Sequence, residues 1–248
     1  MQRLIQGGGT PEPVWQSWLG SARLRAQSLQ EWLPDDARLV VVAPHPDDEV
    51  LACGALLSMH AARGGESLVV AVTDGEASHA GSPHWTGQRL AAARRAESAE
   101  GLSRLGLPDV AVVRLGLPDG QVCRQADRLA KGLKPLLRSN DVVVTTWRLD
   151  GHLDHEATGR SAAGACAAAG CRLVEAPVWM WRWAAPGDLR VPWYRLLGLP
   201  LTPQALGRKQ AALAAHETQL VQRDAEEGPV LGTAILARSD RTTEYFFV

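Results

Sequence analysis

Short apolar runs alternate with longer amphipathic stretches along this chain of 248 residues. Each run spans five to seven residues and is rich in valine and leucine, which is typical of parallel strands buried on both faces. The predicted strands cover residues 39–43, 67–73, 110–115, 141–146 and 171–176, with a terminal strand at 243–248. This alternation predicts an α/β fold in a single domain: a mostly parallel, doubly wound (Rossmann-like) sheet with helices on both faces.

The stretches between the strands have the spacing of amphipathic helices. These predicted helices cover residues 50–63, 88–105, 122–138, 157–169 and 203–223. His60 lies near the end of the first and is interpreted as a helix-end cation or a surface residue. A further helix is predicted over residues 11–33, outside the sheet. We therefore expect residues 1–36 to form an N-terminal helical extension packed on a domain of residues 37–248.

Polar residues gather where the first strand ends. His45, Asp47, Asp48 and Glu49 follow the run 39–43, and open α/β sheets bind ligands beyond the carboxyl ends of their strands. The two adjacent aspartates are expected to point in different directions, so that one can ligate a cation while the other faces bound water. The alternative is a strand followed by an Asp-capped helix, although a cap needs only one of the three acids.

A second polar cluster follows the strand at 141–146. His152 and His155 lie three residues apart, just before an alanine-rich helix. One of them can complete a His/Asp/His set with His45 and Asp48 and leave one coordination position open, which is the pattern of a catalytic zinc site. A histidine pair at this spacing is also common on surfaces and at helix caps, but two strand ends that each carry His and Asp favour the metal site.

The two clusters together resemble the LmbE-like, or PIG-L-type, family of zinc-dependent N-deacetylases. The first motif of that family, His-Pro-Asp-Asp-Glu, stands complete at residues 45–49. The second, His-Pro-Asp-His, corresponds to residues 152–155, with Leu153 in place of the proline. Some members carry a tyrosine two residues before the first histidine of the second motif, where this chain has Asp150.

The resemblance implies a role for each motif residue. His45, Asp48 and His155 would bind one Zn²⁺ or another divalent ion, and Asp47 would be the general base. His152 would assist the transition state, and nearby carboxylates are expected to favour its protonated form. Supporting positions next to these residues are expected at Glu49, Asp150 and Asp154, and substrate contacts at Arg94, Asp119, Trp179 and Trp181.

The implied activity is that of an amide hydrolase. It would remove an acyl group, expected to be acetyl, from an N-acylated amino sugar or its conjugate through attack of metal-bound water on the amide carbonyl. The alternative is a non-catalytic sugar-conjugate binding protein on the same fold, which would have no need of Asp47 along with three ligands. A nucleotide-binding Rossmann enzyme is disfavoured, because the first strand is not followed by Gly-x-Gly-x-x-Gly.

Residues 179–193 have an unusual composition, with Trp179, Trp181, Trp183 and Trp193. The alternation of tryptophan from residue 179 to residue 183 has the period of a strand. Indole rings stack on sugar rings, so these residues are interpreted either as a substrate wall or as part of a core that has only two phenylalanines and two tyrosines.

Charge and cysteine content narrow the class of protein. A net charge of −1 gives no electrostatic footprint for nucleic acid or membrane, so the expected partner is a small-molecule amino-sugar conjugate. The four cysteines show no Cys-x-x-Cys spacing and are typical of a reducing compartment. No signal peptide or membrane span is evident, which favours a cytoplasmic protein. The oligomeric state is not indicated by the sequence.

Overall fold

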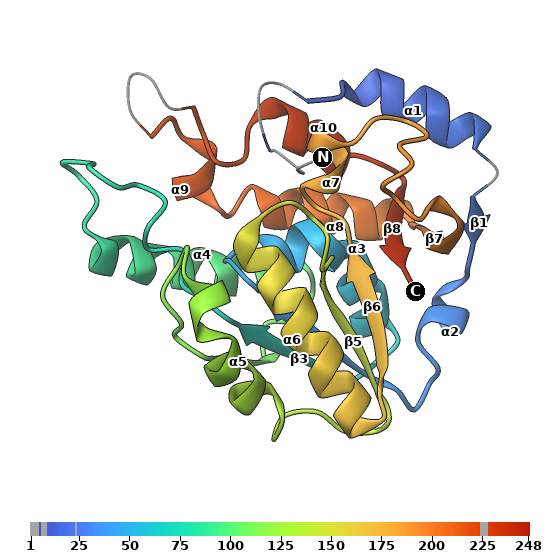
Figure 1. Cartoon of the computed structure of the whole chain (residues 1–248), viewed down its shortest axis with the longest axis horizontal. Helices are drawn as coiled ribbons and strands as arrows, with labels where there is room; N and C mark the ends of the chain where they lie inside the picture. Colours follow the sequence, from blue (N-terminus) through green and yellow to red (C-terminus); the bar gives the residue numbers. More distant parts are fainter. Residues whose placement is uncertain (1–4, 6–8, 23, 224–227) are drawn as a thin grey trace.

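Eight strands form one sheet in the order β1-β7-β8-β6-β5-β2-β3-β4 (Figure 1). The computed structural model describes residues 5, 9–22, 24–223 and 228–248. The strands are β1 (Arg25–Ala26), β2 (Arg38–Ala43), β3 (Ser67–Ala71), β4 (Ala111–Arg114), β5 (Asp141–Thr146), β6 (Arg172–Ala176), β7 (Leu196–Pro200) and β8 (Thr243–Phe247). All pairings are parallel except those of β8, which runs antiparallel to β6 and β7. The predicted fold class is confirmed.

The centre of the sheet is a topological switch point. The chain passes from β2 outward through β3 to β4, and then returns to the other side of β2 to form β5 and β6. The connections that follow β2 and β5 therefore leave the sheet in opposite directions and open a crevice between them. The two motif-bearing segments are the ones that follow these strands.

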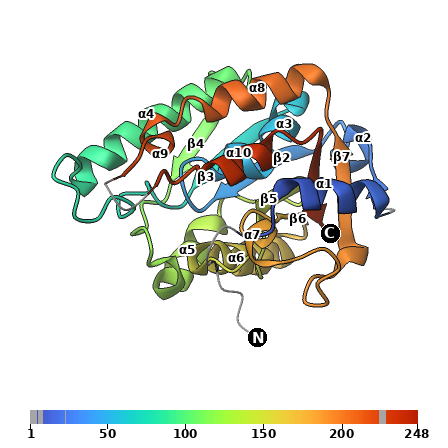
Figure 2. The ribbon, with the colours of Figure 1, turned by 90° about the horizontal axis from the view of Figure 1, so that it is seen from above.

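Helices cover both faces of the sheet, as Figure 2 shows. One face is covered by α3 (Asp48–Ala62), α4 (Gly87–Arg104) and α8 (Pro203–Leu213), and the other by α5 (Ala126–Leu133) and α6 (Leu153–Ala169). The shorter helices are α1 (Glu12–Ser21), α2 (Leu29–Trp32), α7 (Met180–Trp183), α9 (Glu217–Leu220) and α10 (Thr233–Ser239), with 3-10 turns at Val122–Gln125 and Trp193–Arg195.

The core is divided by β2 into two apolar layers. Leu39 and Val41 pack on the α3 side, whereas Val40 and Val42 pack on the α5 and α6 side, and all four are at most 1 % exposed. A strand buried on both faces needs apolar residues at every position, which is why this run lacks the alternation of a surface strand. The polar residues begin only where the strand leaves the sheet.

The N-terminal region differs from its prediction. Instead of one helix over residues 11–33, the chain forms α1, then β1, which pairs in parallel with β7, and then α2. The break has a local cause, because Ser28 and Glu31 form a reciprocal capping box that starts a new helix. A domain boundary at residue 36 remains a prediction, and part of residues 1–36 belongs to the sheet.

Three further segments also differ from prediction. Residues 180–183 form the helical turn α7, so the strand predicted from the tryptophan alternation is wrong. The helix predicted over 203–223 is two helices, α8 and α9, and the helix over 122–138 begins as a 3-10 turn and ends at Leu133. Strand β7 and helix α10 were not predicted.

A second, tryptophan-rich core joins the N-terminal helix to the end of the sheet. Trp15 of α1 is fully buried, donates its indole N–H to the backbone oxygen of Trp181 at 2.8 Å, and packs edge-on against the Trp181 ring. Glu12 forms a two-bond ion pair with Arg241 at 2.7 and 2.8 Å. These contacts tie α1 to α7 and to the turn before β8.

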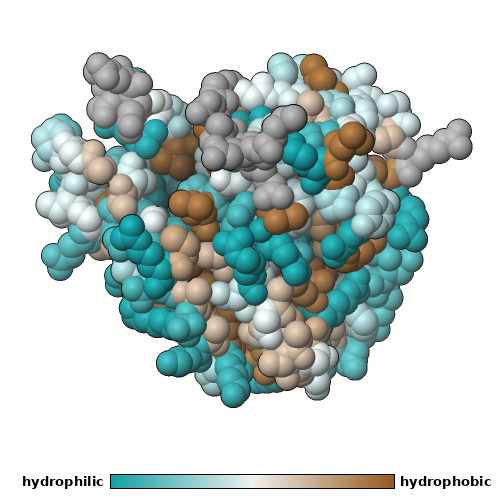
Figure 3. All heavy atoms as spheres, in the orientation of Figure 1, coloured by the Kyte–Doolittle hydropathy of each residue, from teal (hydrophilic) through white to brown (hydrophobic). Residues whose placement is uncertain are grey.

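In the part of the chain that the structure describes, no helix is both long and apolar enough to cross a membrane. On the face shown in Figure 3, hydrophobic residues occur in separate small groups among hydrophilic ones.

Candidate metal centre and active site

The turn after β2 brings the first motif to the sheet edge in a constrained conformation. The backbone oxygen of Pro44 accepts hydrogen bonds from the amide and the hydroxyl of Thr73, at 3.1 and 2.8 Å, which anchors the turn to the end of β3. Asp47 has φ 136°, and it is the only non-glycine residue of the described chain with positive φ. Helix α3 begins at the next residue, Asp48.

The segment after β5 is packed closely against the strand that it follows. The hydroxyl of Thr146 donates to the backbone oxygen of His155 at 3.1 Å, across the first turn of α6. A β-carbon at Gly159 would lie only 2.6 Å from the backbone oxygen of Thr146, so only glycine permits this approach. His155 is thereby held on the first turn of α6 at the same sheet edge as Asp48.

Three donor atoms from the two motifs face one another. Asp48 Oδ2 lies 3.2 Å from His45 Nδ1 and 3.3 Å from His155 Nε2. Ligands bound about 2.0–2.2 Å from a tetrahedral zinc ion lie roughly 3.3–3.6 Å from one another, so this spacing fits a tetrahedral metal. These residues could therefore hold one divalent ion.

In each imidazole, the inner nitrogen is the one that faces Asp48, His45 Nδ1 or His155 Nε2, and the outer nitrogen contacts another carboxylate. His155 Nδ1 donates to Asp150 Oδ2 at 2.9 Å, and His45 Nε2 lies 3.3 Å from Asp119 Oδ1 and 3.5 Å from Asp154 Oδ2. A carboxylate on the outer N–H fixes the ring and leaves the inner nitrogen free to bind a metal. The supporting positions expected at Asp150 and Asp154 thus lie next to the two histidines.

The site offers other donor combinations as well. His45 Nε2 with Asp119 and Asp154 brings three donor atoms within 4.8 Å of one another, as do the three histidines 45, 152 and 155. In the first of these sets the Asp154 carboxylate also accepts the amides of Gly120 and Val122 at 2.7 and 3.0 Å, and Asp48 Oδ2 likewise accepts the amide of His45 at 3.1 Å. Asp48 Oδ2 is distinguished by its short distances to imidazole nitrogens from both motifs, 3.2 and 3.3 Å.

Electrostatics at the site favour a cation. Burial alone would lower the pKa of His45, but the carboxylates of Asp119, Asp154 and Asp48 raise it well above its usual value. Burial likewise opposes the charged form of His155, yet Asp48 and Asp150 raise its pKa to about 9. Burial would raise the pKa of Asp48, but His155 and His45 lower it far below its usual value. The same negative potential would hold a divalent ion, which would replace the protons on His45 Nδ1 and His155 Nε2.

Asp47 is buried and lines the same cavity as His45, Asp48 and His155. Burial and the negative charge of Asp48 raise the pKa of Asp47 well above its usual value. Its backbone amide donates to Glu49 Oε2 at 3.0 Å, while Glu49 Oε1 accepts from the Ser98 hydroxyl at 2.5 Å. Glu49 therefore supports the turn, and Asp47 has the raised pKa expected of a general base.

His152 lies beside His45 and His155 and next to Trp179. Its ring centroid is 4.8 Å from that of His155 and 5.1 Å from that of His45, and it lies nearly parallel to the Trp179 ring at 6.1 Å. Burial and the charges of His155 and His45 lower the pKa of His152 to about 3. The sequence favoured a protonated His152, but burial, together with the charges of His155 and His45, opposes that form more strongly than the carboxylates favour it. A neutral ring still has one N–H to donate.

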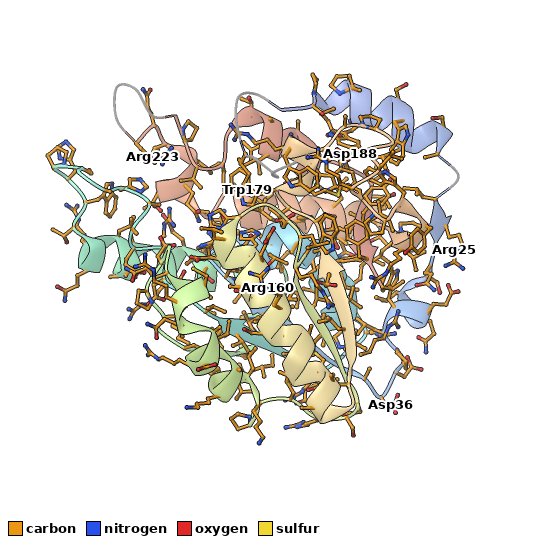
Figure 4. The ribbon with its side chains drawn as sticks, in the orientation of Figure 1. Arg25, Asp36, Arg160, Trp179, Asp188 and Arg223 are labelled. Carbon is orange, nitrogen blue, oxygen red and sulfur yellow. The ribbon has the colours of Figure 1, made fainter. Side chains whose placement is uncertain are left out.

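A cavity of about 280 Å³ opens over these residues. Arg94, Asp119 and Trp179, three of the residues predicted to contact substrate, line it, and the Arg94 guanidinium donates to Ser78 Oγ at 2.7 Å. Trp179, labelled in Figure 4, lies above the N-terminal end of α6. Trp181 does not line this cavity and is 5 % exposed in the tryptophan core, so for Trp181 the core interpretation holds.

Several lining residues carried no sequence signal. Ser78 lies in the loop after β3, and Gln219 of α9 donates its side-chain amide to the backbone oxygen of Pro46. Val230, Leu231 and Ile235, at and before α10, form an apolar side of the cavity together with Leu51 and Val178. Tertiary packing alone brings these C-terminal residues to the cavity, and no local sequence pattern predicts that they line it.

The sequence matches a family model over residues 40–166, just over half of the chain. The model is that of PIG-L, described as GlcNAc-PI de-N-acetylase. This chain belongs to the PIG-L family. The matched region contains both motifs and every residue expected to bind metal. No curated protein matches the sequence.

Several solved structures share the fold of this PIG-L family member. The N,N'-diacetylchitobiose deacetylase of Pyrococcus horikoshii is 22 % identical, with a TM-score of 0.54 over 76 % of this chain and 73 % of that one. The teicoplanin deacetylase Orf2, in a zinc-inhibited form, is 20 % identical, with a TM-score of 0.63 over 85 % and 97 %. The conserved protein TT1542 of Thermus thermophilus is 28 % identical, with a TM-score of 0.56 over 85 % and 93 %. These likenesses establish the fold.

Proposed function

We propose that this protein is a zinc-dependent N-deacetylase that hydrolyses the amide of an N-acetylated amino sugar or its conjugate. The observation that carries the proposal is the position of Asp48 Oδ2, 3.2 and 3.3 Å from the inner nitrogens of His45 and His155, with Asp47 one residue away. The family description and the names of the similar structures support an acetylated sugar as substrate.

The chemistry divides among the residues as follows. His45, Asp48 and His155 would hold a divalent metal, which would supply the Lewis acidity needed to lower the pKa of water and to polarise an amide carbonyl. Asp47 accepts the proton of the attacking water and later returns it to the leaving amine, which is possible because its raised pKa is closer to neutrality. Neutral His152 donates its N–H to the developing oxyanion.

The remaining residues of the cavity fit a sugar. Arg94 and Asp119 bring a donor group and an acceptor group to the polar side of the cavity, where ring hydroxyls can pair with both. Trp179 offers an aromatic ring at the cavity, on which a sugar ring can stack. A non-catalytic binding protein is not favoured, since it would gain nothing from a buried, strained Asp47 beside three metal ligands.

The test is an assay of free amine. Protein stripped of metal and protein loaded with one equivalent of zinc are incubated with N-acetylglucosamine conjugates, and with N-acetylated amino acids as the control class. We expect amine release only from sugar conjugates and only after zinc is added. Release from the amino acids alone, or equal release by stripped protein, would contradict the proposal.

A further inference from the structure

Helix α3, which begins at the metal ligand Asp48, is broken in its second turn. Cys53 has φ −153° and ψ 28°, far from helical values, so α3 consists of two helical halves joined at a kink. A kink of this kind interrupts the ladder of hydrogen bonds from each amide to the carbonyl four residues earlier. The amide of Ala55 and the carbonyl of Leu51 are partners in an unbroken helix, and the kink frees both of them.

Two side chains from distant parts of the chain take up the freed groups. Glu244 of β8 accepts the amides of Ala55 and Leu56, one on each carboxylate oxygen and both at 2.9 Å. Lys209 of α8 donates to the carbonyl oxygen of Leu51 at 3.1 Å and to Glu244 at 2.7 Å. Figure 2 shows α8 lying along α3, the arrangement that brings Lys209 to the kink.

The charges of the pair have the signs that the two helix halves require. A carboxylate is favourable at the N-terminal end of a helix, where Glu244 meets the second half, and an ammonium is favourable at a C-terminal end, where Lys209 meets the first half. Both side chains are buried, at 4 and 5 % exposure. The Lys209 stem packs on α3 at Gly54, where a β-carbon would lie 3.4 Å from Lys209 Cγ.

We infer that Lys209 and Glu244 are positioning residues that set the direction of the first turn of α3 and thereby the place of Asp48 relative to His155. The inference rests on the proposed function, because it concerns the same metal site. Asp48 and His155 lie on different helices, so their separation depends on how the first half of α3 leaves the kink. A buried ion pair contributes little net stability compared with apolar side chains of similar volume, and its value here lies in fixing one geometry.

The chain offers a matched control pair at the opposite edge of the sheet. Arg38 and Asp141 begin β2 and β5, are 6 and 1 % exposed, and form two hydrogen bonds of 2.8 Å. This pair joins the same two strands that carry the motifs, but at their amino ends. Its removal should affect stability without moving the site.

The test compares two double variants, each of which removes a whole pair so that no buried charge is left alone. Lys209→Met/Glu244→Gln should lower zinc affinity about 10–100-fold, the range typical of residues that orient metal ligands. Turnover should fall with it, while KM changes less than threefold, because the expected substrate contacts come from other elements. Arg38→Met/Asp141→Asn should leave zinc affinity within threefold of the wild type. Equal zinc affinities in the two variants would overturn the inference.

A measurement on the unaltered protein does not depend on either variant folding. Coupling between sites is reciprocal, so zinc binding should in turn stabilise the kink. Hydrogen exchange at the amides of Ala55 and Leu56 should therefore slow more on adding zinc than exchange at Arg138, whose amide donates to Asp141 at 2.7 Å. Equal slowing at all three amides would overturn the inference. A zinc-bound wild type that releases no amine would refute the proposed function and leave both of these readouts intact.

Discussion

Asp47 is the residue at which local backbone strain and chemistry coincide. A φ of 136° is rarely adopted by residues other than glycine. It persists here because the Asp47 amide donates a hydrogen bond to Glu49 and the Pro46 carbonyl accepts one from Gln219. We propose that the two adjacent aspartates serve different purposes, Asp48 as a metal ligand and Asp47 as the general base. The two adjacent acids led to this prediction, whereas the positive φ of Asp47 has no signature in the sequence.

Replacement of Asp47 by asparagine should separate metal binding from turnover. An amide side chain of the same shape keeps the turn but cannot accept a proton from water, so we expect a loss of about 10²–10⁴-fold in kcat. Zinc content, measured by atomic absorption, should stay at the wild-type level. A variant within a few-fold of wild-type turnover would remove Asp47 from the role of base.

Replacement of His152 by alanine tests the oxyanion donor. We expect kcat to fall roughly 10²–10³-fold, as for the loss of one such donor, with zinc content unchanged. Because the pKa of His152 is lowered to about 3, the ring is already neutral in the pH range of the assay, and its loss should change the rate uniformly from pH 6 to pH 9. Loss of zinc in this variant would mean that His152 is itself a ligand.

At the scale of elements, the site depends on two loops at one topological switch point. β2 and β5 are adjacent and parallel, and the helices that follow them lie on opposite faces of the sheet. The sequence predicted both strands and placed both motifs at their carboxyl ends. The approach of α6 to β5, which depends on Gly159 and Thr146, appears only in the structure.

His155→Ala should abolish tight metal binding, because it removes one of three donors and the only one supplied by α6. Zinc affinity, measured by competition with a chelating dye, is expected to fall by several orders of magnitude. Leu153→Ala, an exposed neighbour on the same turn, is the control and should bind zinc as the wild type does. Stoichiometric zinc with full activity in His155→Ala would exclude His155 as a ligand.

The far end of α3 gives a prediction about pH. His60 is fully buried, with its ring against Gly65, and burial lowers its pKa, so its interpretation as a helix-end cation or surface residue is wrong. A histidine kept neutral in the folded state stabilises the fold above pH 6.5, and this contribution is lost as the unfolded chain takes up its proton at lower pH.

We therefore expect the stability of the wild type to decline relative to His60→Gln as the pH falls from 7.5 to 5. The slope of the difference should reach at most about 1.4 kcal/mol per pH unit, the value for one proton. Urea unfolding of both proteins across this range measures it. A difference in unfolding free energy that is independent of pH would show that His60 is not held neutral.

At the scale of the whole molecule, the sequence predicted the strands and motifs that depend on local patterns, and it missed most of the features that depend on contacts between distant segments. The parallel sheet and the residues of both motifs follow from apolar runs and strand ends. The pairing of β1 with β7 and the Trp15–Trp181 contact bring together segments more than 150 residues apart. The lowered pKa of His152 was missed for the same reason, since it depends on burial in the folded chain and on the charges of His155 and His45. The break between α1 and α2 is different, because the capping box of Ser28 and Glu31 is a local signal that the prediction of one helix over residues 11–33 overlooked.

The most direct test of the central claim is anomalous diffraction from zinc-soaked crystals, recorded on both sides of the zinc absorption edge. The account predicts a single strong peak about 2.0–2.2 Å from His45 Nδ1, Asp48 Oδ2 and His155 Nε2, with Asp47 beside it. A peak between His45 Nε2, Asp119 and Asp154, or the absence of any peak at this edge of the sheet, would contradict the account.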